Sequence, residues 1–120
     1  MNNKTNKHLK VDAKALDGIQ FIKAEGRIDH SNVIELAKLK KLIDDKNRLV
    51  LLDISKVNYV SSSFIHFLLN FEELINKHKG KLAIVIQSEF VMHVLALTGA
   101  KLRYKIFHVD EDALAYLKNP

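Results

Sequence analysis

Three consecutive serines, Ser61, Ser62 and Ser63, form the part of the chain best suited to chemistry. They follow the strand-like residues Tyr59-Val60 and precede apolar residues at helical spacing that begin with Phe64, which is the pattern of a helix start. Serine hydroxyls at a helix start can cap free backbone N–H groups. They can also carry a phosphate, because the positive end of the helix dipole favours an anion. The cluster therefore predicts a capped helix, a phosphorylation site, or both.

Catalysis by Ser63 is the alternative use of this cluster. Asp53 and His66 could in principle serve as its partners, but a chain of this size contains such side chains by chance. The flanking glycines that form the nucleophile elbow of α/β-hydrolases are absent around Ser63. We therefore expect a non-enzymatic protein with no catalytic residues.

The sequence also lacks the patterns that hold metals and cofactors. None of the six histidines has the spacing of a metal site, and the four glycines lie too far apart for a phosphate-binding loop. There is no cysteine, which excludes disulfides and thiolate metal ligands. We expect no metal and no cofactor.

Length and charge place the chain in a broad class. A chain of 120 residues is long enough for one domain with a hydrophobic core. No apolar run approaches the roughly 20 residues that span a bilayer, and the polar N-terminus does not resemble a signal peptide, so we expect a cytoplasmic protein without membrane insertion. The formal net charge is +5, but the lysines are scattered, so we expect no nucleic-acid partner.

The N-terminal part predicts a tail, a hairpin and a helix. Residues 1–7 are rich in Asn and Lys and are expected to be disordered, with the domain covering residues 8–118. Alternating residues from His8 and a turn at Asp17-Gly18 predict a β-hairpin whose second strand ends at residues 26–29. A helix is expected over Asn32–Asp45, with Asn32 and Glu35 forming a capping box.

The central part contains a buried strand and the longest helix. The apolar run Leu49–Ile54 predicts a strand, followed by a short loop and a helix over Ser62–His78. One face of that helix is apolar, and the opposite face is a polar ridge that contains Ser63 and His66. Ile65 and Leu69 lie between the two faces. They either flank the core, which we favour, or form an apolar patch for a partner.

The remaining elements complete an alternating pattern. Strands are expected at Leu82–Ile86 and Ile106–Val109, and helices at Glu89–Thr98 and from Asp110 to Leu117. A hairpin followed by alternating strands and helices predicts an α/β domain with a mixed, mainly parallel sheet of four to five strands and about four helices.

In this order and spacing, several segments together resemble the STAS domain family, the fold of bacterial anti-sigma factor antagonists. The similarity extends over about residues 8–117. It depends on Gly26-Arg27-Ile28-Asp29, on residues 49–55 before the serines, on residues 94–99 and on Asp112-Ala113-Leu114.

The resemblance implies a site at the start of the second helix. The antagonists carry an Asp-Ser-Ser-Gly motif whose second serine is phosphorylated by an anti-sigma kinase. Here the motif falls on Ser61, Ser62, Ser63 and Phe64, so that the Asp and Gly positions both differ. The resemblance assigns phosphorylation to Ser63, and less strongly to Ser62, and places Asp29 near the partner surface.

The resemblance also implies what the domain binds. The expected partner is an anti-sigma factor with serine kinase activity, which would dock on Asp29, Ser61–Ser63, Ile65, His66 and Leu69 of a monomer or weak homodimer. STAS modules also act as constitutive scaffolds or subunits, in stress-signalling assemblies or beside transporter ATPases, and the altered motif fits such a member. A nucleotide-binding protein or small enzyme is the third class, and only reports of nucleotide binding in relatives suggest it.

Overall fold

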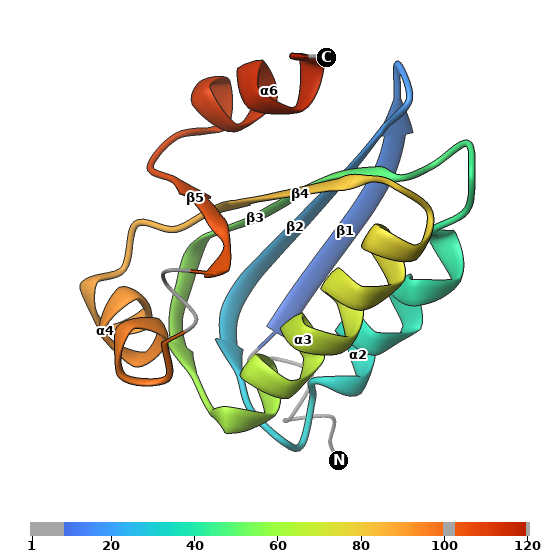
Figure 1. Ribbon diagram of the computed structural model, residues 1–120. Coiled ribbons are helices and arrows are strands. Elements are labelled where there is room, and N and C mark those ends of the chain that lie inside the picture. The colour runs from blue at the N-terminus through green and yellow to red at the C-terminus, as the bar shows by residue number, and fades with distance from the viewer. Residues whose placement is uncertain (1–8, 100–102, 120) are drawn as a thin grey trace.

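The computed structural model describes residues 9–99 and 103–119, and within them the chain forms a five-stranded sheet (Figure 1). The expected tail over residues 1–7 lies outside the described residues. The strands lie in the order β1-β2-β3-β4-β5. β1 is antiparallel to β2, and the other neighbours are parallel, which confirms the predicted mixed sheet. Their bounds are β1 Leu9–Leu16, β2 Ile19–Ile28, β3 Leu49–Val60, β4 Lys81–Val85 and β5 Lys105–Phe107.

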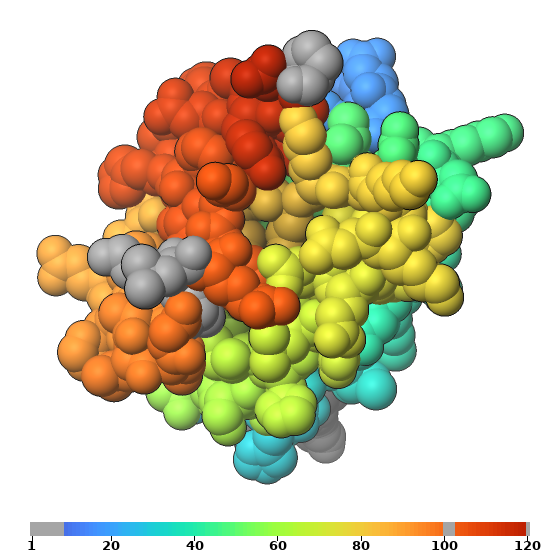
Figure 2. Space-filling view, viewed as in Figure 1, coloured from blue at the N-terminus to red at the C-terminus, as the bar shows by residue number. Residues whose placement is uncertain are grey.

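Helices cover both faces of the sheet, but unequally. The described helices are α2 (Ile34–Ala37), which continues as the 3-10 helix η1 (Lys38–Leu42), α3 (Ser62–Lys77), α4 (Glu89–Leu97) and α6 (Asp110–Lys118). α2, α3 and α4 contribute to one apolar cluster, and α6 contributes to a second cluster on the opposite face. In the space-filling view of Figure 2, α3 (yellow-green) lies between α4 (orange) and the α2 region (cyan).

The alternation of side chains along β3 explains why its sequence is almost continuously apolar. Val50, Leu52 and Ile54 belong to the cluster under α2, α3 and α4, whereas Leu51 belongs to the cluster under α6. A strand that is buried on both faces must carry apolar residues at successive positions. The prediction that this strand lies inside the sheet is confirmed, because β3 pairs with β2 on one side and β4 on the other.

The hairpin and its turn are confirmed. β1 and β2 pair from Leu9 opposite Gly26 to Leu16 opposite Ile19. The two turn residues, Asp17 and Gly18, have φ values of 54° and 79°. Positive φ at both positions is the requirement of the two-residue turn that matches the twist of a hairpin.

The helix predicted over Asn32–Asp45 is wrong at both ends. The α-helical part covers only Ile34–Ala37, and the 3-10 segment ends at Leu42, since Ile43 is extended. Asp44 Oδ1 accepts hydrogen bonds from the backbone N–H groups of Lys46 and Asn47, and this local turn replaces the last helical turn. The capping box is also wrong, because Val33 is the N-cap residue and provides no side-chain hydrogen bond.

One further boundary differs from the sequence prediction. No loop precedes the serine cluster: β3 continues to Val60, because residues up to Val60 pair with β2. α3 ends at Lys77, and Lys79 adopts the left-handed conformation, with a φ of 60°. Gly80 is needed for space instead, since a Cβ there would lie 2.0 Å from the carbonyl oxygen of Arg48.

Among the described residues, no helix is both long enough and apolar enough to cross a membrane.

Candidate functional site

The serine cluster forms the N-terminus of α3, as the sequence predicts. Ser61 is the N-cap residue with extended backbone, and its Oγ accepts a hydrogen bond from the Ser63 N–H at 3.3 Å. The Ser61 N–H donates to the carbonyl of Ile28 at 3.0 Å, which joins the cluster to the end of β2. Ser62 is exposed and Ser63 is half-buried. The three hydroxyls therefore have different surroundings, and only that of Ser61 caps the helix.

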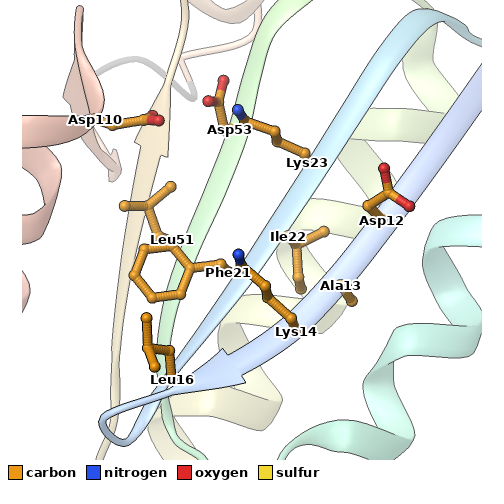
Figure 3. A pocket seen from close by; sticks show the side chains of 10 residues that line it. All are labelled: Asp12, Ala13, Lys14, Leu16, Phe21, Ile22, Lys23, Leu51, Asp53 and Asp110. Atoms are coloured by element: carbon orange, nitrogen blue, oxygen red, sulfur yellow. The ribbon is translucent and has the colours of Figure 1, made fainter.

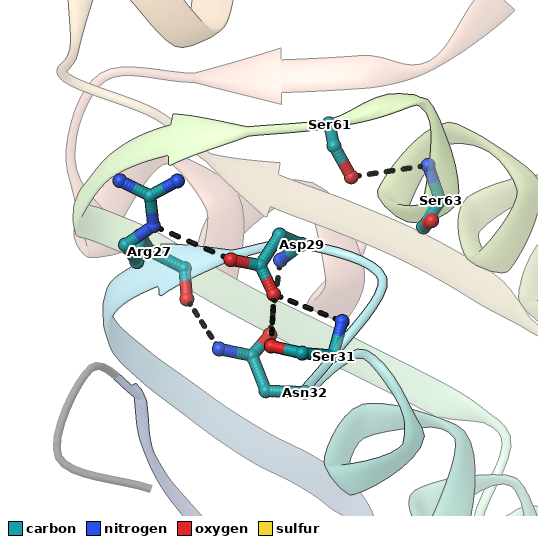
Figure 4. A network of polar contacts seen from close by, with 6 residues as sticks. All are labelled: Arg27, Asp29, Ser31, Asn32, Ser61 and Ser63. Carbon is teal, nitrogen blue, oxygen red and sulfur yellow. Dashed lines mark hydrogen bonds and ion pairs between the residues drawn. The ribbon is translucent and has the colours of Figure 1, made fainter. Parts of the chain in front are cut away.

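Asp29 lies in a compact hydrogen-bonded loop directly after β2 (Figure 4). Its Oδ1 accepts from Ser31 twice, from the backbone N–H at 3.0 Å and from the Oγ at 2.6 Å. Its Oδ2 lies 3.4 Å from the Nε of Arg27. The hydrogen bond from the Ser31 hydroxyl, together with that from its N–H and with Arg27, lowers the pKa of Asp29 below its ordinary value. The loop therefore presents a charged carboxylate in a fixed orientation.

The side chain of Asn32 hydrogen-bonds to the backbone of this loop. Only 3% of its surface is exposed. Its Oδ1 accepts from the N–H of Asp29, and its Nδ2 donates to the carbonyl of Arg27, both at 3.0 Å. The sequence predicts a helix cap at Asn32 and misses this role. The signal available was the Asp-x-x-Asn spacing, which suits a side-chain-stabilised turn as well as it suits a helix start.

The sheet brings Asp29 and the serines to the same edge. Ile28 and Val60 are opposite each other in the β2–β3 register, so the residues that follow both strands leave the sheet side by side. Parallel neighbours end at a common edge, where ligands and partners are typically bound. The expected grouping of Asp29 with the start of the second helix is thus present, although the two are more than thirty residues apart in the sequence.

A shallow groove runs between α2 and α3 from this edge. It has a volume of about 440 Å³ and contains Ser62, Ser63, His66 and Asn70 from α3, together with Phe67, and Val33 and Ala37 from the α2 side. Ser63 and His66 are therefore on one surface, as predicted. Val33 and Ala37 were not predicted as site residues. Both lie within the predicted first helix, but nothing in the sequence places that helix beside α3.

Ile65 and Leu69 behave differently from each other. Ile65 packs against the main apolar cluster and is partly buried, as a residue at the edge of the core would be. Leu69 is 38% exposed, and Ile34 on α2 is 58% exposed. The two alternatives from the sequence are thus divided between the two residues, and Ile34 adds an exposed apolar side chain that was not predicted.

The arrangement does not support a serine hydrolase. Asp53 belongs to β3 but lies in a hollow on the opposite face of the sheet, away from the groove that contains Ser63 and His66. No acid–histidine–serine series is therefore assembled among residues 9–99 and 103–119. The same residues contain no group of three or more His, Asp or Glu side chains positioned to hold a metal ion.

The hollow on the opposite face has a volume of about 550 Å³ and contains Lys23, Asp53 and Asp110 above the apolar side chains of Phe21 and Leu51 (Figure 3). Burial, then a hydrogen bond from protonated Asp110 to the Asp53 carboxylate and repulsion between the two acids, raises the pKa of Asp110 to about 6. Burial, the largest single influence, would raise the pKa of Asp53, but hydrogen bonds from Ser55 and Asp110 and the charge of Lys23 together lower it. The sequence predicts only that Asp110 begins the last helix, and the acid pair is missed because it joins distant segments.

The fold is that of a known family. A family model described as the STAS domain matches residues 10–113, which is most of the chain. The chain belongs to the STAS domain family. Over 92% of its length it is 23% identical to 96% of a Bordetella bronchiseptica protein provisionally named anti-sigma factor antagonist BtrV.

Solved STAS structures share the fold. An anti-sigma factor antagonist from Mycobacterium paratuberculosis superposes with a TM-score of 0.83 at 20% identity, over 92% of this chain and 95% of that chain. The anti-sigma factor antagonist SpoIIAA in its unphosphorylated form gives 0.78 at 16% identity, over 91% and 96%. Its phosphorylated form, from Bacillus, gives 0.66 at 12% identity, over 91% and 100%.

Proposed function

We propose that this STAS domain is a cytoplasmic, non-enzymatic regulatory protein that binds an anti-sigma factor with serine kinase activity. The observation that carries this proposal is the joint presentation of Ser63 and Asp29. Ser63 lies on the α2–α3 groove at a helix N-terminus, and Asp29 is held in a fixed loop at the same sheet edge. The matched relatives are named anti-sigma factor antagonists, and this supports the choice of partner.

The proposed regulation is phosphorylation of Ser63, or less favourably of Ser62. Ser63 Oγ would bond to the γ-phosphorus of ATP held by the kinase partner. The bond to the β-phosphate oxygen would break, ADP would leave and the hydroxyl proton would pass to a base of the kinase. The phosphate adds about −1.5 to −2 charges at neutral pH. The N-terminus of α3 favours that charge, so the fold tolerates the modification.

The switch acts at the interface with the partner rather than on the fold. Unphosphorylated, the groove with Ser63 and His66 would accept the partner, while Asp29 would offer a carboxylate to a donor on it. A phosphate in the groove adds bulk, charge repulsion toward the partner and a desolvation cost at the interface. A loss of about 1.4 kcal/mol already weakens binding tenfold, so a modest penalty is enough to release the partner.

Crosslinking from the groove tests this function. A photoreactive residue in place of His66 should crosslink in the cells of origin to an anti-sigma factor with a kinase domain, and the same residue in place of Leu16, at the distant hairpin turn, should not. Phosphosite analysis of the purified protein should then find phosphate on Ser63 or Ser62. Failure to recover an anti-sigma factor specifically from position 66 would contradict the proposal.

A constitutive scaffold is the second candidate, and one observation favours it. Ser61 takes the motif position of Asp and acts as a helix cap, and Phe64 takes the position of Gly and is fully buried. The serines would then be structural, and phosphate would be absent from Ser62 and Ser63 under both growth and stress. Recovery of a partner without any phosphorylation would favour this candidate over the switch.

A further inference from the structure

Three side chains from three elements stack beside the docking site. Arg27 on β2 and Tyr59 on β3 are opposite each other in the sheet register, and the Arg27 guanidinium carbon lies 4.3 Å from the centre of the Tyr59 ring. Phe90 on α4 stacks on the same tyrosine, with ring centroids 5.5 Å apart and planes inclined by 14°. β2 flanks β3 on one side and α4 follows β4 on the other, so the tyrosine lies between the arginine and the phenylalanine.

The core does not need Phe90. α4 is anchored to the sheet by Val91 and Leu95, both of which are fully buried, whereas 46% of Phe90 is exposed. Leu97 follows seven residues later, two helical turns along the same face, and is 74% exposed. An aromatic and an aliphatic side chain thus form an apolar strip on the outer face of α4 that no described residue covers.

The strip is continuous with the docking site. Arg27 joins the stack to Asp29 through the 3.4 Å contact between its Nε and the Asp29 Oδ2. The last residue of β4, Val85, pairs with Asp53, and β3 continues to Val60. α4 lies beside this extension of β3, because Phe90 stacks on Tyr59, two residues before Ser61. In Figure 2 the orange atoms of α4 adjoin the lime-green start of α3 on the surface. One partner docked on the groove can therefore reach Phe90 without leaving this end of the molecule.

The residue types point to an interface rather than to a chance exposure. Arginine and aromatic residues are enriched among the few residues that carry most of a binding energy. Stacking already orders these three side chains, which lowers the entropy lost on binding. Of the three guanidinium nitrogens of Arg27, only Nε is paired with a carboxylate among the described residues. The two terminal nitrogens remain as donors for a partner.

We propose that the partner footprint extends from the groove over the Arg27–Tyr59–Phe90 stack and the outer face of α4. The occupant is the same anti-sigma factor, so this inference depends on the proposed function. It presents apolar side chains to Phe90 and Leu97 and a carboxylate to Arg27. Phe90 is a specificity-determining contact: it strengthens binding but takes no part in phosphorylation.

The test uses the purified anti-sigma factor recovered by crosslinking and the full chain, with affinities measured by calorimetry. Phe90→Ala and Leu97→Asp should each weaken binding at least fivefold. Leu16→Asp, a matched change at an apolar residue 54% exposed on the hairpin turn, should leave it unchanged. Leu97→Asp keeps the test valid if Phe90→Ala disturbs the stack, because Leu97 is the more exposed of the two.

The outcomes separate this inference from the proposed function. A change below fivefold for either α4 variant, with normal binding by the wild type, overturns the extended footprint and leaves the groove intact. An equal loss for Leu16→Asp overturns it too, since the effect would not be specific to α4. Failure of the wild type itself to bind would refute the proposed function, and the footprint with it.

Discussion

At the scale of single residues, the three serines do different things although they are identical in sequence. Only Ser61 has a hydroxyl that accepts from the helix backbone. Ser61→Ala should therefore lower the free energy of unfolding by about 1 kcal/mol, the usual effect of losing an N-cap. Urea unfolding measures this, with Ser63→Ala as the control, which should change stability by less than about 0.5 kcal/mol. Equal losses for the two variants would contradict the distinction.

Asp29 shows how a neighbouring side chain sets the charge of a site. Its lowered pKa depends first on the hydrogen bond from the Ser31 hydroxyl. Ser31→Ala removes that bond and should raise the pKa of Asp29 toward its ordinary value, because the carboxylate loses a donor that favours the charged form. NMR titration of the Asp29 carboxyl carbon measures the shift. Ser62→Ala is the control, since no bond joins Ser62 to Asp29, and an unchanged midpoint in Ser31→Ala would refute the assignment.

At the scale of elements, the end of α3 depends on the backbone conformation of Lys79 and on the absence of a side chain at Gly80. Lys79 adopts a φ of 60°, which glycine tolerates better than lysine, whereas Gly80 approaches Arg48 too closely for a Cβ. We expect Lys79→Gly to stabilise the protein by about 0.5 kcal/mol, as strain is removed at some entropic cost. Gly80→Ala should destabilise it by about 2 kcal/mol or more, as β3 and β4 are forced apart. Thermal unfolding of both variants, compared with Lys77→Gly, measures this; stabilisation by Gly80→Ala would contradict it.

The packing of α6 on the sheet should depend on pH through Asp110. The pKa of this residue is about 6 in the folded protein and near 3.8 when unfolded, so the folded state binds the proton more tightly. Stability should therefore fall as the pH rises from about 4 to about 6, with no further loss from this group above that range. The lowered pKa of Asp53 acts in the opposite direction and below this window, where stability falls as the pH falls. Lys23 and Glu111 also face the pair and modify the repulsion.

The variant Asp110→Asn isolates this effect. It keeps a hydrogen bond donor beside Asp53 and removes the titration. We expect a weaker pH dependence between pH 4 and 6, and about 1 kcal/mol more stability than the wild type at pH 7, after allowing for solvent screening of this partly exposed group. Urea unfolding across this range measures both quantities, and Asp112→Asn, on the exposed side of the same turn, should retain the wild-type profile. An identical slope in Asp110→Asn would show that the pair is not coupled.

At the scale of the whole molecule, the sequence predicts the sheet better than it predicts the boundaries and the polar contacts. The apolar runs Leu49–Leu52 in β3 and Leu82–Val85 in β4 reflect burial on both faces, and the Asp17-Gly18 turn depends only on local conformation. The length of the first helix was wrong because the Asp44 side chain competes for the backbone. The Asn32 bridge is local, but its Asp-x-x-Asn spacing suits a helix start as well as a turn. The Asp53–Asp110 pair joins distant segments, and no local pattern encodes it.

The proposed binding surface and the acid pair lie on different parts of the molecule. The groove, the Asp29 loop and the exposed strip of α4 lie at one end of the sheet, beside α2, α3 and α4, whereas the acid pair lies under α6 on the opposite face. Changes at Asp110 should therefore affect stability without affecting partner binding. Changes at Ser63 should affect partner binding without affecting stability.

The phosphorylation switch is tested by measuring the affinity of the recovered anti-sigma factor for the wild type, Ser63→Ala and Ser63→Asp. Ser63→Ala should bind like the unphosphorylated wild type. Ser63→Asp should bind at least tenfold more weakly, a loss of about 1.4 kcal/mol, with an unchanged unfolding midpoint. Equal affinities for all three proteins would contradict the switch.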